Sequence, residues 1–253
     1  MIRAVNLRKQ YSSVVAVKDL NLTIEKGEVF GFLGPNGAGK TTTIKIMAGL
    51  LRPTSGQVTI NGFDIARDPT PAKAITGFIP DRPYVYGKLT GMEFLQFIAG
   101  LYRIDEREWR PRAVELLKLF ELRDWAGELV ESYSHGMKQR LVMSVALLHR
   151  PKVLIVDEPM VGLDPKGARL VKRIFRRLAD DGLAVFMSTH TLEVAEEVCD
   201  RVGIIHKGEL IESGTLEQLR QRAGGPERLE AIFLDLTGAD EDEIGGEPPP
   251  LKF

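Results

Sequence analysis

The chain has 253 residues, of which 43% are hydrophobic and 27% charged, so it can bury the core of one α/β domain or of two small ones. The formal net charge of −1 gives no support for nonspecific nucleic-acid binding, and no apolar run approaches the roughly 20 residues that span a bilayer. A single cysteine, Cys199, excludes an internal disulfide, and the first residues lack the long apolar core of a signal peptide, so we expect a reducing, cytosolic setting.

The first quarter of the chain is rich in predicted strands. Apolar residues alternate or run continuously over 3–7, 20–24, 28–34 and 57–62. Between the last two strands, residues 41–51 carry apolar side chains at helical spacing. A strand, a glycine-rich turn and a helix therefore follow one another.

The glycine-rich turn reads GPNGAGKTT and covers residues 34–42. Its glycines let successive backbone N–H groups point into one concavity at the start of a helix, which is an anion site. Lys40 can reach the β- and γ-phosphates of a nucleotide, and the Thr41 hydroxyl can ligate Mg²⁺. This order of elements is that of a P-loop, and we predict that the chain binds a nucleoside triphosphate.

The middle of the chain, about 88–150, is predicted to be a helical subdomain. Apolar residues recur at helical spacing over 91–102 and 112–122, as packing faces require. After it, strands are predicted at 152–157, 183–189 and 201–206, with helices at 167–180 and 192–199 between them. This alternation predicts an α/β fold: a P-loop NTPase core with a mainly parallel sheet, an N-terminal antiparallel β part and the inserted helical subdomain.

The last 32 residues are predicted to differ from the body. Leu229, Ile232, Phe233 and Leu236 have helical spacing, so we expect a C-terminal helix over 222–238 that docks on the body. The tail 239–253 is acidic and then proline-rich, which is typical of poorly ordered chain.

A second candidate site feature is VLIVDEP, residues 153–159, an apolar run that ends in two carboxylates. A buried strand delivers Asp157 and Glu158 at its C-terminal end, where open α/β sheets bind ligands. Asp157 can reach the magnesium shell, as the corresponding residue does in P-loop NTPases. Glu158 is free to polarise a water for attack on the γ-phosphate.

Three further stretches make the prediction more specific: YSHGMKQR at 133–140, GLDP at 162–165 and STH at 188–190. Together with the P-loop and the acidic strand, they occur in a fixed order at characteristic separations. The set resembles the nucleotide-binding subunit of ABC transporters, and the resemblance extends from residue 2 to about residue 221, the predicted ATPase domain.

The resemblance implies roles for individual residues. The nucleotide would be bound by Tyr11, Gly34, Pro35, Asn36, Gly37, Ala38, Gly39, Lys40, Thr41, Thr42, Ser134, Gly136 and Asp164. The implied catalytic residues are Lys40, Glu158 and the switch histidine His190, and the implied Mg²⁺ ligands are Thr41, Asp81 and Asp157. In the family, the residue matching Tyr11 stacks on adenine, while those matching Ser134 and Gly136 touch the γ-phosphate held by the other subunit of a head-to-tail dimer.

The sequence departs from the family at Asp81, where glutamine is usual. Aspartate can still accept a hydrogen bond from a magnesium-bound water, but it adds a negative charge and lacks the amide donor. The stretch after it carries Tyr84 and Tyr86, which are either an exposed aromatic contact for a membrane partner or part of a loop packed on its own subdomain.

We therefore expect an ATPase subunit that uses ATP and Mg²⁺, pairs with a second copy or a close paralogue, and drives a separate transmembrane permease. Residues 78–102 together with 229–238 look like those of ABC-2-type exporters, so export is the expected direction. The resemblance places such a subunit in the cytoplasm, at the inner face of the cell membrane, with no nucleic-acid partner.

Two alternatives are weighed against this function. A soluble ABC-type ATPase acting on DNA would carry a long coiled-coil insertion, but Lys40 and Ser134 are only 94 positions apart (134 − 40), and ribosome-acting types usually carry two such domains. A nonhydrolytic nucleotide-sensing module is suggested by Asp81, although Glu158 and His190 are both present.

Overall fold

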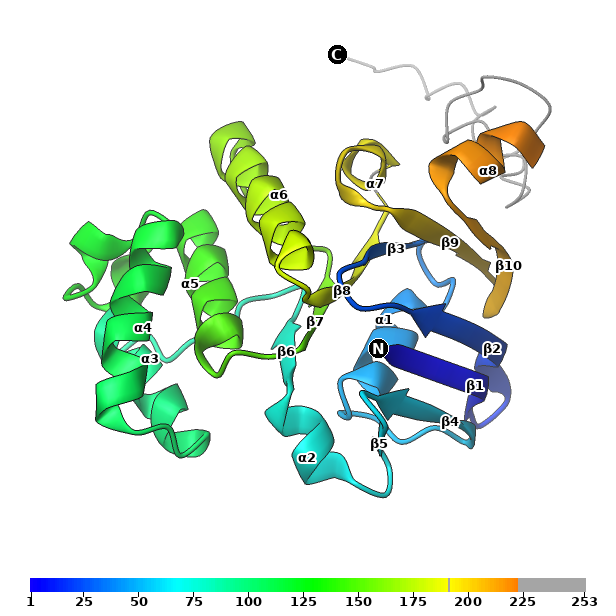
Figure 1. Cartoon of the computed structure of the whole chain (residues 1–253), viewed down its shortest axis with the longest axis horizontal. Coiled ribbons are helices and arrows are strands. Elements are labelled where there is room, and N and C mark those ends of the chain that lie inside the picture. Colours follow the sequence, from blue (N-terminus) through cyan, green and yellow to red (C-terminus); the bar gives the residue numbers. More distant parts are fainter. Residues whose placement is uncertain (191, 223–253) are drawn as a thin grey trace, which may run out of the picture.

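The structure is a computed structural model that describes residues 1–190 and 192–222. Two sheets form its framework (Figure 1). The smaller sheet is antiparallel, in the order β2 (Val14–Ile24), β1 (Ile2–Tyr11), β4 (Ser55–Ile60), β5 (Phe63–Asp64). The larger sheet has the order β10 (Glu209–Gly214), β9 (Arg201–His206), β3 (Val29–Leu33), β8 (Ala184–Thr189), β7 (Val153–Asp157), β6 (Thr76–Ile79), and its pairs are parallel except β10 with β9.

Helix α1 (Lys40–Met47) packs in a core that contains side chains of both sheets. Its buried residues Ile44 and Met47 share this core with Ile2 of β1 and with Phe30 and Phe186 of the larger sheet. All five residues of β3 are buried, as a strand covered on both faces requires. The loop that connects β3 to α1 is thereby fixed at the carboxyl edge of the larger sheet.

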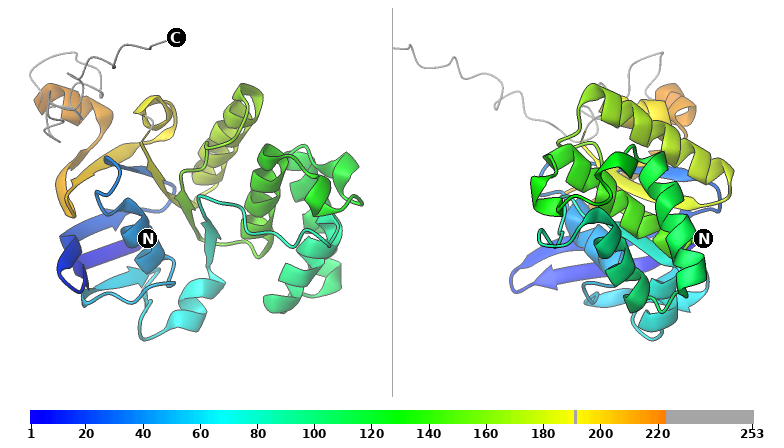
Figure 2. Two further views of the ribbon diagram at one scale, coloured as in Figure 1. Left: turned by 180° about the vertical axis from the view of Figure 1, so that it is seen from behind. Right: turned by 90° about the vertical axis from the view of Figure 1, so that its left-hand side faces the viewer.

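Three helices form a separate lobe, the green part of Figures 1 and 2. They are α3 (Gly91–Leu101), α4 (Glu106–Leu119) and α5 (His135–Leu148), with short 3-10 turns at Arg123–Trp125 and Val130–Ser132. Thr90 and Glu93 form a reciprocal capping box at the start of α3. All three helices fall within the range 88–150 that was predicted for the helical subdomain.

The remaining helices are α2 (Pro69–Ala74), α6 (Pro165–Asp180), α7 (Leu192–Val198) and α8 (Leu216–Arg222). Helix α6 buries Val171, Ile174 and Phe175, while the opposite side of the helix carries lysine and arginine. The strands β5 and β10 and the helix α2 were not predicted, because they are short or polar. In the part of the chain that the structure describes, no helix is long and apolar enough to cross a membrane.

The predicted mixed architecture is confirmed: a mainly parallel sheet, an antiparallel N-terminal sheet and intervening helices. The expected C-terminal helix and acidic tail lie outside the described residues, apart from Arg222, which ends α8.

Candidate functional site

The loop between β3 and α1 needs glycine at several positions. Gly37 and Gly39 have φ values of 80° and 107°, which residues other than glycine rarely adopt. A Cβ on Gly39 would also lie 2.4 Å from the carbonyl oxygen of Ala16, and one on Gly34 would lie 2.3 Å from that of Ile205. The loop therefore follows the neighbouring backbone more closely than any larger residue would allow.

Lys40, the first residue of α1, turns back into this loop. Its Nζ donates to the carbonyl oxygens of Gly34 at 2.6 Å and Pro35 at 3.1 Å. Burial lowers the pKa of Lys40, and the carboxylates of Glu158 and Asp157 act in the opposite direction. The ammonium group is therefore partly stripped of water, which strengthens its attraction for a phosphate, while the two carboxylates keep it in its charged form.

Asp157 ends β7 and is 3% exposed. Its carboxylate accepts hydrogen bonds from the Ser188 hydroxyl, at 2.5 Å, and from the Thr41 side chain. Burial raises the pKa of Asp157, and the negative charges of Asp81 and Glu158 raise it further, while the two hydrogen bonds lower it. A buried carboxylate beside two others is the setting in which a divalent cation is most strongly stabilised.

Glu158 follows Asp157 with a φ of 48°, in the left-handed region that is uncommon for residues other than glycine. Its N–H donates to Ser188 Oγ at 3.2 Å, and its Oε2 lies 3.0 Å from Nδ1 of His190. This backbone turn directs the Glu158 side chain away from the strand and toward the end of β8. The histidine is 56% exposed and the glutamate 17%, so the pair lies at the mouth of the site.

These elements enclose one hollow of about 350 Å³. It is lined by Ala16, Pro35, Asn36, Gly37, Gly39, Lys40, Thr41, Thr42, Asp81, Asp157, Glu158 and His190. Residues predicted from four separate stretches of sequence thus meet in one place. Asp81, which departs from the usual glutamine, faces this hollow after β6.

Six of the predicted nucleotide-binding residues do not line the hollow. Gly34 and Ala38 form its supporting loop, with Ala38 buried in the core between the sheets. Tyr11 ends β1 at 45% exposure, with Lys9 Nζ 5.0 Å from the centre of its ring. The other three, Ser134, Gly136 and Asp164, belong to the starts of two helices.

Ser134 and Asp164 cap the N-termini of α5 and α6. Ser134 Oγ accepts from the Met137 N–H at 3.3 Å, and Asp164 Oδ1 accepts from the Gly167 N–H at 2.9 Å. A Cβ on Gly136, in the first turn of α5, would lie 3.4 Å from the carbonyl oxygen of Gly162, which is two residues before the cap of α6. The starts of the two helices are therefore neighbours. They form a second, separate surface of the chain, which carries two helix N-termini and their partial positive charge.

Sequence reasoning missed one residue that lines the hollow and one buried residue that supports it. Ala16 contributes from β2, and nothing in its type or spacing indicates a ligand contact. Ser188 connects Asp157 and Glu158 by hydrogen bonds, and its polarity within the otherwise apolar end of a buried strand is a signal that could have identified it.

This geometry agrees with comparisons to known proteins. Residues 17–161 match the model of the family described as ABC transporter. The chain belongs to the ABC transporter family. The predicted ATP-binding ATPase subunit of this family is therefore confirmed.

Among its relatives is the Linearmycin resistance ATP-binding protein LnrL of Bacillus subtilis (strain 168), which is 38% identical over 241 residues, or 95% of this chain and 76% of LnrL. A solved ATP-binding subunit of an ABC transporter superposes with a TM-score of 0.88 at 32% identity, covering 94% of this chain and 99% of the other. The ABC cassette MJ0796, a dimer in a post-hydrolysis state with ADP and Pi, superposes with a TM-score of 0.78 at 29% identity, covering 85% and 99%.

Proposed function

We propose that this ABC transporter subunit binds ATP with Mg²⁺ in the 350 Å³ hollow and hydrolyses it within a head-to-tail dimer, to drive export through a separate membrane subunit. The observation that carries the proposal is the convergence of Lys40, Asp157 and the Glu158–His190 pair on that hollow. A nonhydrolytic sensor would not require a carboxylate and an imidazole 3.0 Å apart at the phosphate end.

The donor groups in the hollow fit Mg²⁺. Asp157, Asp81 and the Thr41 hydroxyl offer oxygen ligands of the kind that this hard cation prefers. Burial raises the pKa of Asp157, as do the charges of Asp81 and Glu158, and a nearby cation would offset both effects. These three residues would hold the ion or its bound waters, and the ion would neutralise charge on the β- and γ-phosphates.

Lys40 and Glu158 would act on the γ-phosphate from two sides. Binding of a triphosphate lets Lys40 exchange its bonds to Gly34 and Pro35 for phosphate oxygens, which stabilise the ammonium charge better than neutral carbonyls do. Glu158 would accept a proton from the attacking water, and His190 would hold the glutamate side chain in place through the contact at Oε2.

The positions of Ser134, Gly136 and Asp164 support the proposed dimer. These residues do not line the hollow of their own chain, and the helix N-termini next to them are suited to an anion. We place this surface over the hollow of a second copy, so that ATP is held between two chains, with Tyr11 stacked on the adenine. The dimeric state of MJ0796 supports this arrangement.

The membrane partner would contact the aromatic surface after Asp81. Tyr86 packs edge-on against Phe94 and Phe97 of α3, with ring centres 5.9 and 5.2 Å apart, so this loop rests on its own subdomain. Tyr84 nevertheless stays 78% exposed and Tyr86 58%, which leaves both available to a partner. This contact would hold the subunit at the cytoplasmic face of the membrane, and the resistance function named for LnrL supports export.

The proposal is tested by isolating the tagged chain from detergent-solubilised membranes and measuring Mg²⁺-dependent ATP hydrolysis. We expect a membrane protein in a stable ratio to the chain, and a hydrolysis rate that responds to it. An ATPase that never co-purifies with a membrane protein would contradict the coupling, while a chain that binds but does not hydrolyse ATP would contradict the catalytic roles.

A further inference from the structure

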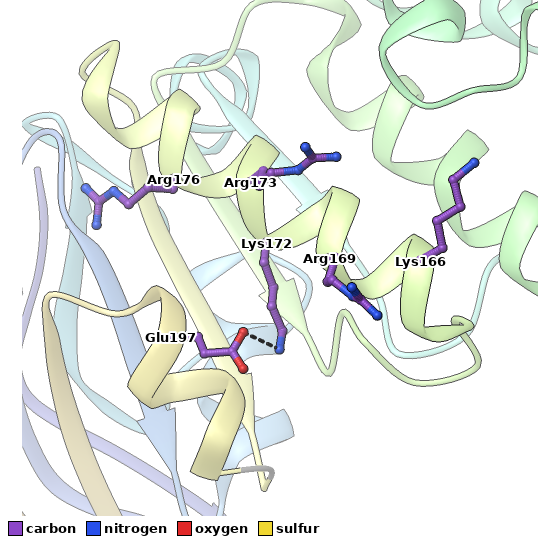
Figure 3. A pocket seen from close by; sticks show the side chains of 6 residues that line it. All are labelled: Lys166, Arg169, Lys172, Arg173, Arg176 and Glu197. Carbon is purple, nitrogen blue, oxygen red and sulfur yellow. Dashed lines mark hydrogen bonds and ion pairs between the residues drawn. The ribbon is translucent and has the colours of Figure 1, made fainter.

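One side of α6 carries a continuous stripe of cations. The stripe consists of Lys166, Arg169, Lys172, Arg173 and Arg176, and we call it the basic stripe. Apart from the consecutive pair Lys172 and Arg173, each member lies three positions from the next, so their side chains are neighbours on the helix surface. With Glu197 of α7 they line a hollow of about 670 Å³ (Figure 3). This hollow shares no lining residue with the nucleotide site.

Three of the five cations of the basic stripe are paired with carboxylates of the described chain. Lys166 pairs with Glu121 at 3.0 Å, and Lys172 pairs with Glu197 at 2.8 Å. Arg176 binds two carboxylates, those of Asp180 at 3.2 Å and Asp200 at 2.8 Å.

Arg169 and Arg173 are exposed, and among the described residues neither has a hydrogen-bond or ion-pair partner. Two guanidinium groups one helical turn apart repel each other unless an anion lies between them. Arg169 and Arg173 therefore offer an open site for carboxylates, which arginine binds in a bidentate way.

The described chain ends close to this site. Arg220 of α8 pairs with Glu196 at 3.1 Å, and the next residue, Glu197, pairs with Lys172 of the basic stripe. Helix α7 thus lies between α8 and α6, as Figures 1 and 2 show. Arg222, the last described residue, is also held by Glu212 of β10, so the chain leaves the body from a fixed point.

The sequence after Arg222 supplies a fitting anion. Residues 239–247 contain five carboxylates and no lysine or arginine; they are Asp240, Glu241, Asp242, Glu243 and Glu247. Asp240 lies eighteen positions after Arg222 (240 − 222), a stretch that spans about 27 Å if it is helical, as expected over 222–238, and at most about 60 Å when fully extended. The segment can therefore reach the basic stripe of its own chain.

We propose that the acidic segment 239–247 binds the basic stripe of α6 in the same chain, with its carboxylates on Arg169 and Arg173. Tethering favours this occupant over a separate anionic partner, because a linker of this kind holds the segment at an effective concentration in about the millimolar range. Single exposed ion pairs are weak, so the contact depends on several carboxylates acting together.

The proposal can be tested on the full-length chain with a water-soluble carbodiimide. This reagent couples a carboxylate to a lysine amine that contacts it, which forms an amide, and the reagent itself takes up the released water and becomes a urea. Mass spectrometry of the digest should find amides between segment 239–247 and Lys166 or Lys172. The pairs Lys166–Glu121 and Lys172–Glu197 provide internal controls, because they are in contact in the folded chain.

The double variant Arg169→Glu with Arg173→Glu keeps both lysines. It should lose the amides to the acidic segment while the two internal controls persist, and those controls also show that the variant is folded. The matched variant Arg107→Glu with Arg110→Glu, on the exposed side of α4, should keep the amides between the acidic segment and Lys166 or Lys172. Unchanged amides in the first variant, or tail amides spread over lysines all round the surface, would overturn the proposal.

Whether the contact lies within one chain is decided by mixing unlabelled and ¹⁵N-labelled protein before the reaction. Amides within chains of one isotope support the proposal. Amides between light and heavy chains in the proportion expected for random pairing would show that the segment binds a second copy instead, which would overturn it.

Discussion

Nδ1 of His190 lies 3.0 Å from Oε2 of Glu158, across the ends of two neighbouring parallel strands. The imidazole is the more exposed partner, so it fixes the carboxylate from the solvent side while Ser188 fixes the Glu158 backbone from the buried side. Both the side chain and the backbone of Glu158 are thus held in place, so in the proposed reaction its carboxylate would accept a proton without first having to be ordered.

The first prediction concerns this carboxylate. Glu158→Gln keeps the shape of the side chain but cannot accept a proton, so the hydrolysis rate should fall by a factor of about 10² to 10⁴ while ATP still binds. The variant should accumulate as a dimer in ATP and Mg²⁺, measured by size-exclusion chromatography with light scattering. Glu193→Gln, at an exposed position on α7, is the control, and a Glu158→Gln chain that stays monomeric at high concentration would argue against the proposed dimer.

Lys40→Ala should weaken ATP binding by about tenfold or more, because a charge-assisted hydrogen bond contributes about 1.5–3 kcal/mol and the loop has no second lysine. Isothermal titration with a nonhydrolysable ATP analogue measures the loss. Lys45→Ala, on the exposed side of the same helix, should bind normally. Equal affinities of the two variants would be inconsistent with a phosphate contact at Lys40.

Asp81→Gln restores the usual family residue and removes one of the three carboxylates around the hollow. The Mg²⁺ concentration for half-maximal ATPase activity should rise, while the melting temperature without nucleotide should stay nearly unchanged, since Asp81 is exposed. A titration of ATPase activity with Mg²⁺ compares wild type and variant, and Asp124→Asn serves as a control at an exposed position. An unshifted curve would remove Asp81 from the metal site.

Gly39 and Gly37 allow a matched test of the loop. Gly39→Ala should destabilise the chain by about 1–3 kcal/mol or more, because it combines a strained φ with a Cβ 2.4 Å from the carbonyl oxygen of Ala16. Gly37→Ala has a similar φ but no atom within 4 Å of the new Cβ, so its cost should be smaller. Urea denaturation measures both, and equal losses would refute the close backbone contact.

His149 predicts a pH dependence of stability. Its ring stacks on Tyr102 with centres 4.0 Å apart, and burial lowers the pKa of His149, although the hydrogen bond to the Thr76 carbonyl acts the other way. A lowered pKa favours the neutral ring in the folded state, so this contribution to stability is complete above the ordinary histidine pKa of about 6.5 and is lost as the pH falls below it.

The variant His149→Phe keeps the stacking and cannot titrate. Its free energy of unfolding should therefore decline less than that of the wild type between pH 7 and pH 5, as measured by urea denaturation. His135→Gln, which changes an exposed imidazole, should follow the wild type. Parallel curves for wild type and His149→Phe would refute the assignment.

Much of the fold could be predicted because its elements carry strong periodic patterns. The apolar run of β7 and the amphipathic pattern of α6 are local properties, and their alternation indicates a parallel sheet. The two-residue strand β5 and the proline-bearing helix α2 have no such pattern, and they form because of what they pack against. Their existence depends on tertiary contacts that sequence periodicity does not encode.

The residues of the hollow could be predicted where their chemistry is explicit, as at Lys40, Asp157 and Asp81, and the structure brings these together. The position of Ala16 in the hollow could not be predicted, because an alanine side chain has no functional group that indicates a ligand contact. The hydrogen bond from Lys40 to the Gly34 carbonyl could not be predicted either, since it depends on the folded shape of the loop. The catalytic, nucleotide and metal roles of these residues stay predictions until the variants are measured.

The hydroxyl of Ser188 couples the register of β8 and β7 to the geometry of the site. It donates to Asp157 and accepts from the N–H of Glu158, while His190, which directly follows β8, contacts the Glu158 side chain. A slip of β8 by one residue against β7 would turn Ser188 to the opposite face and break all three contacts together. A copy with misaligned strands would therefore lack the arrangement of Asp157, Glu158 and His190 on which the proposed hydrolysis depends, so the correct register of β8 and a complete site form together.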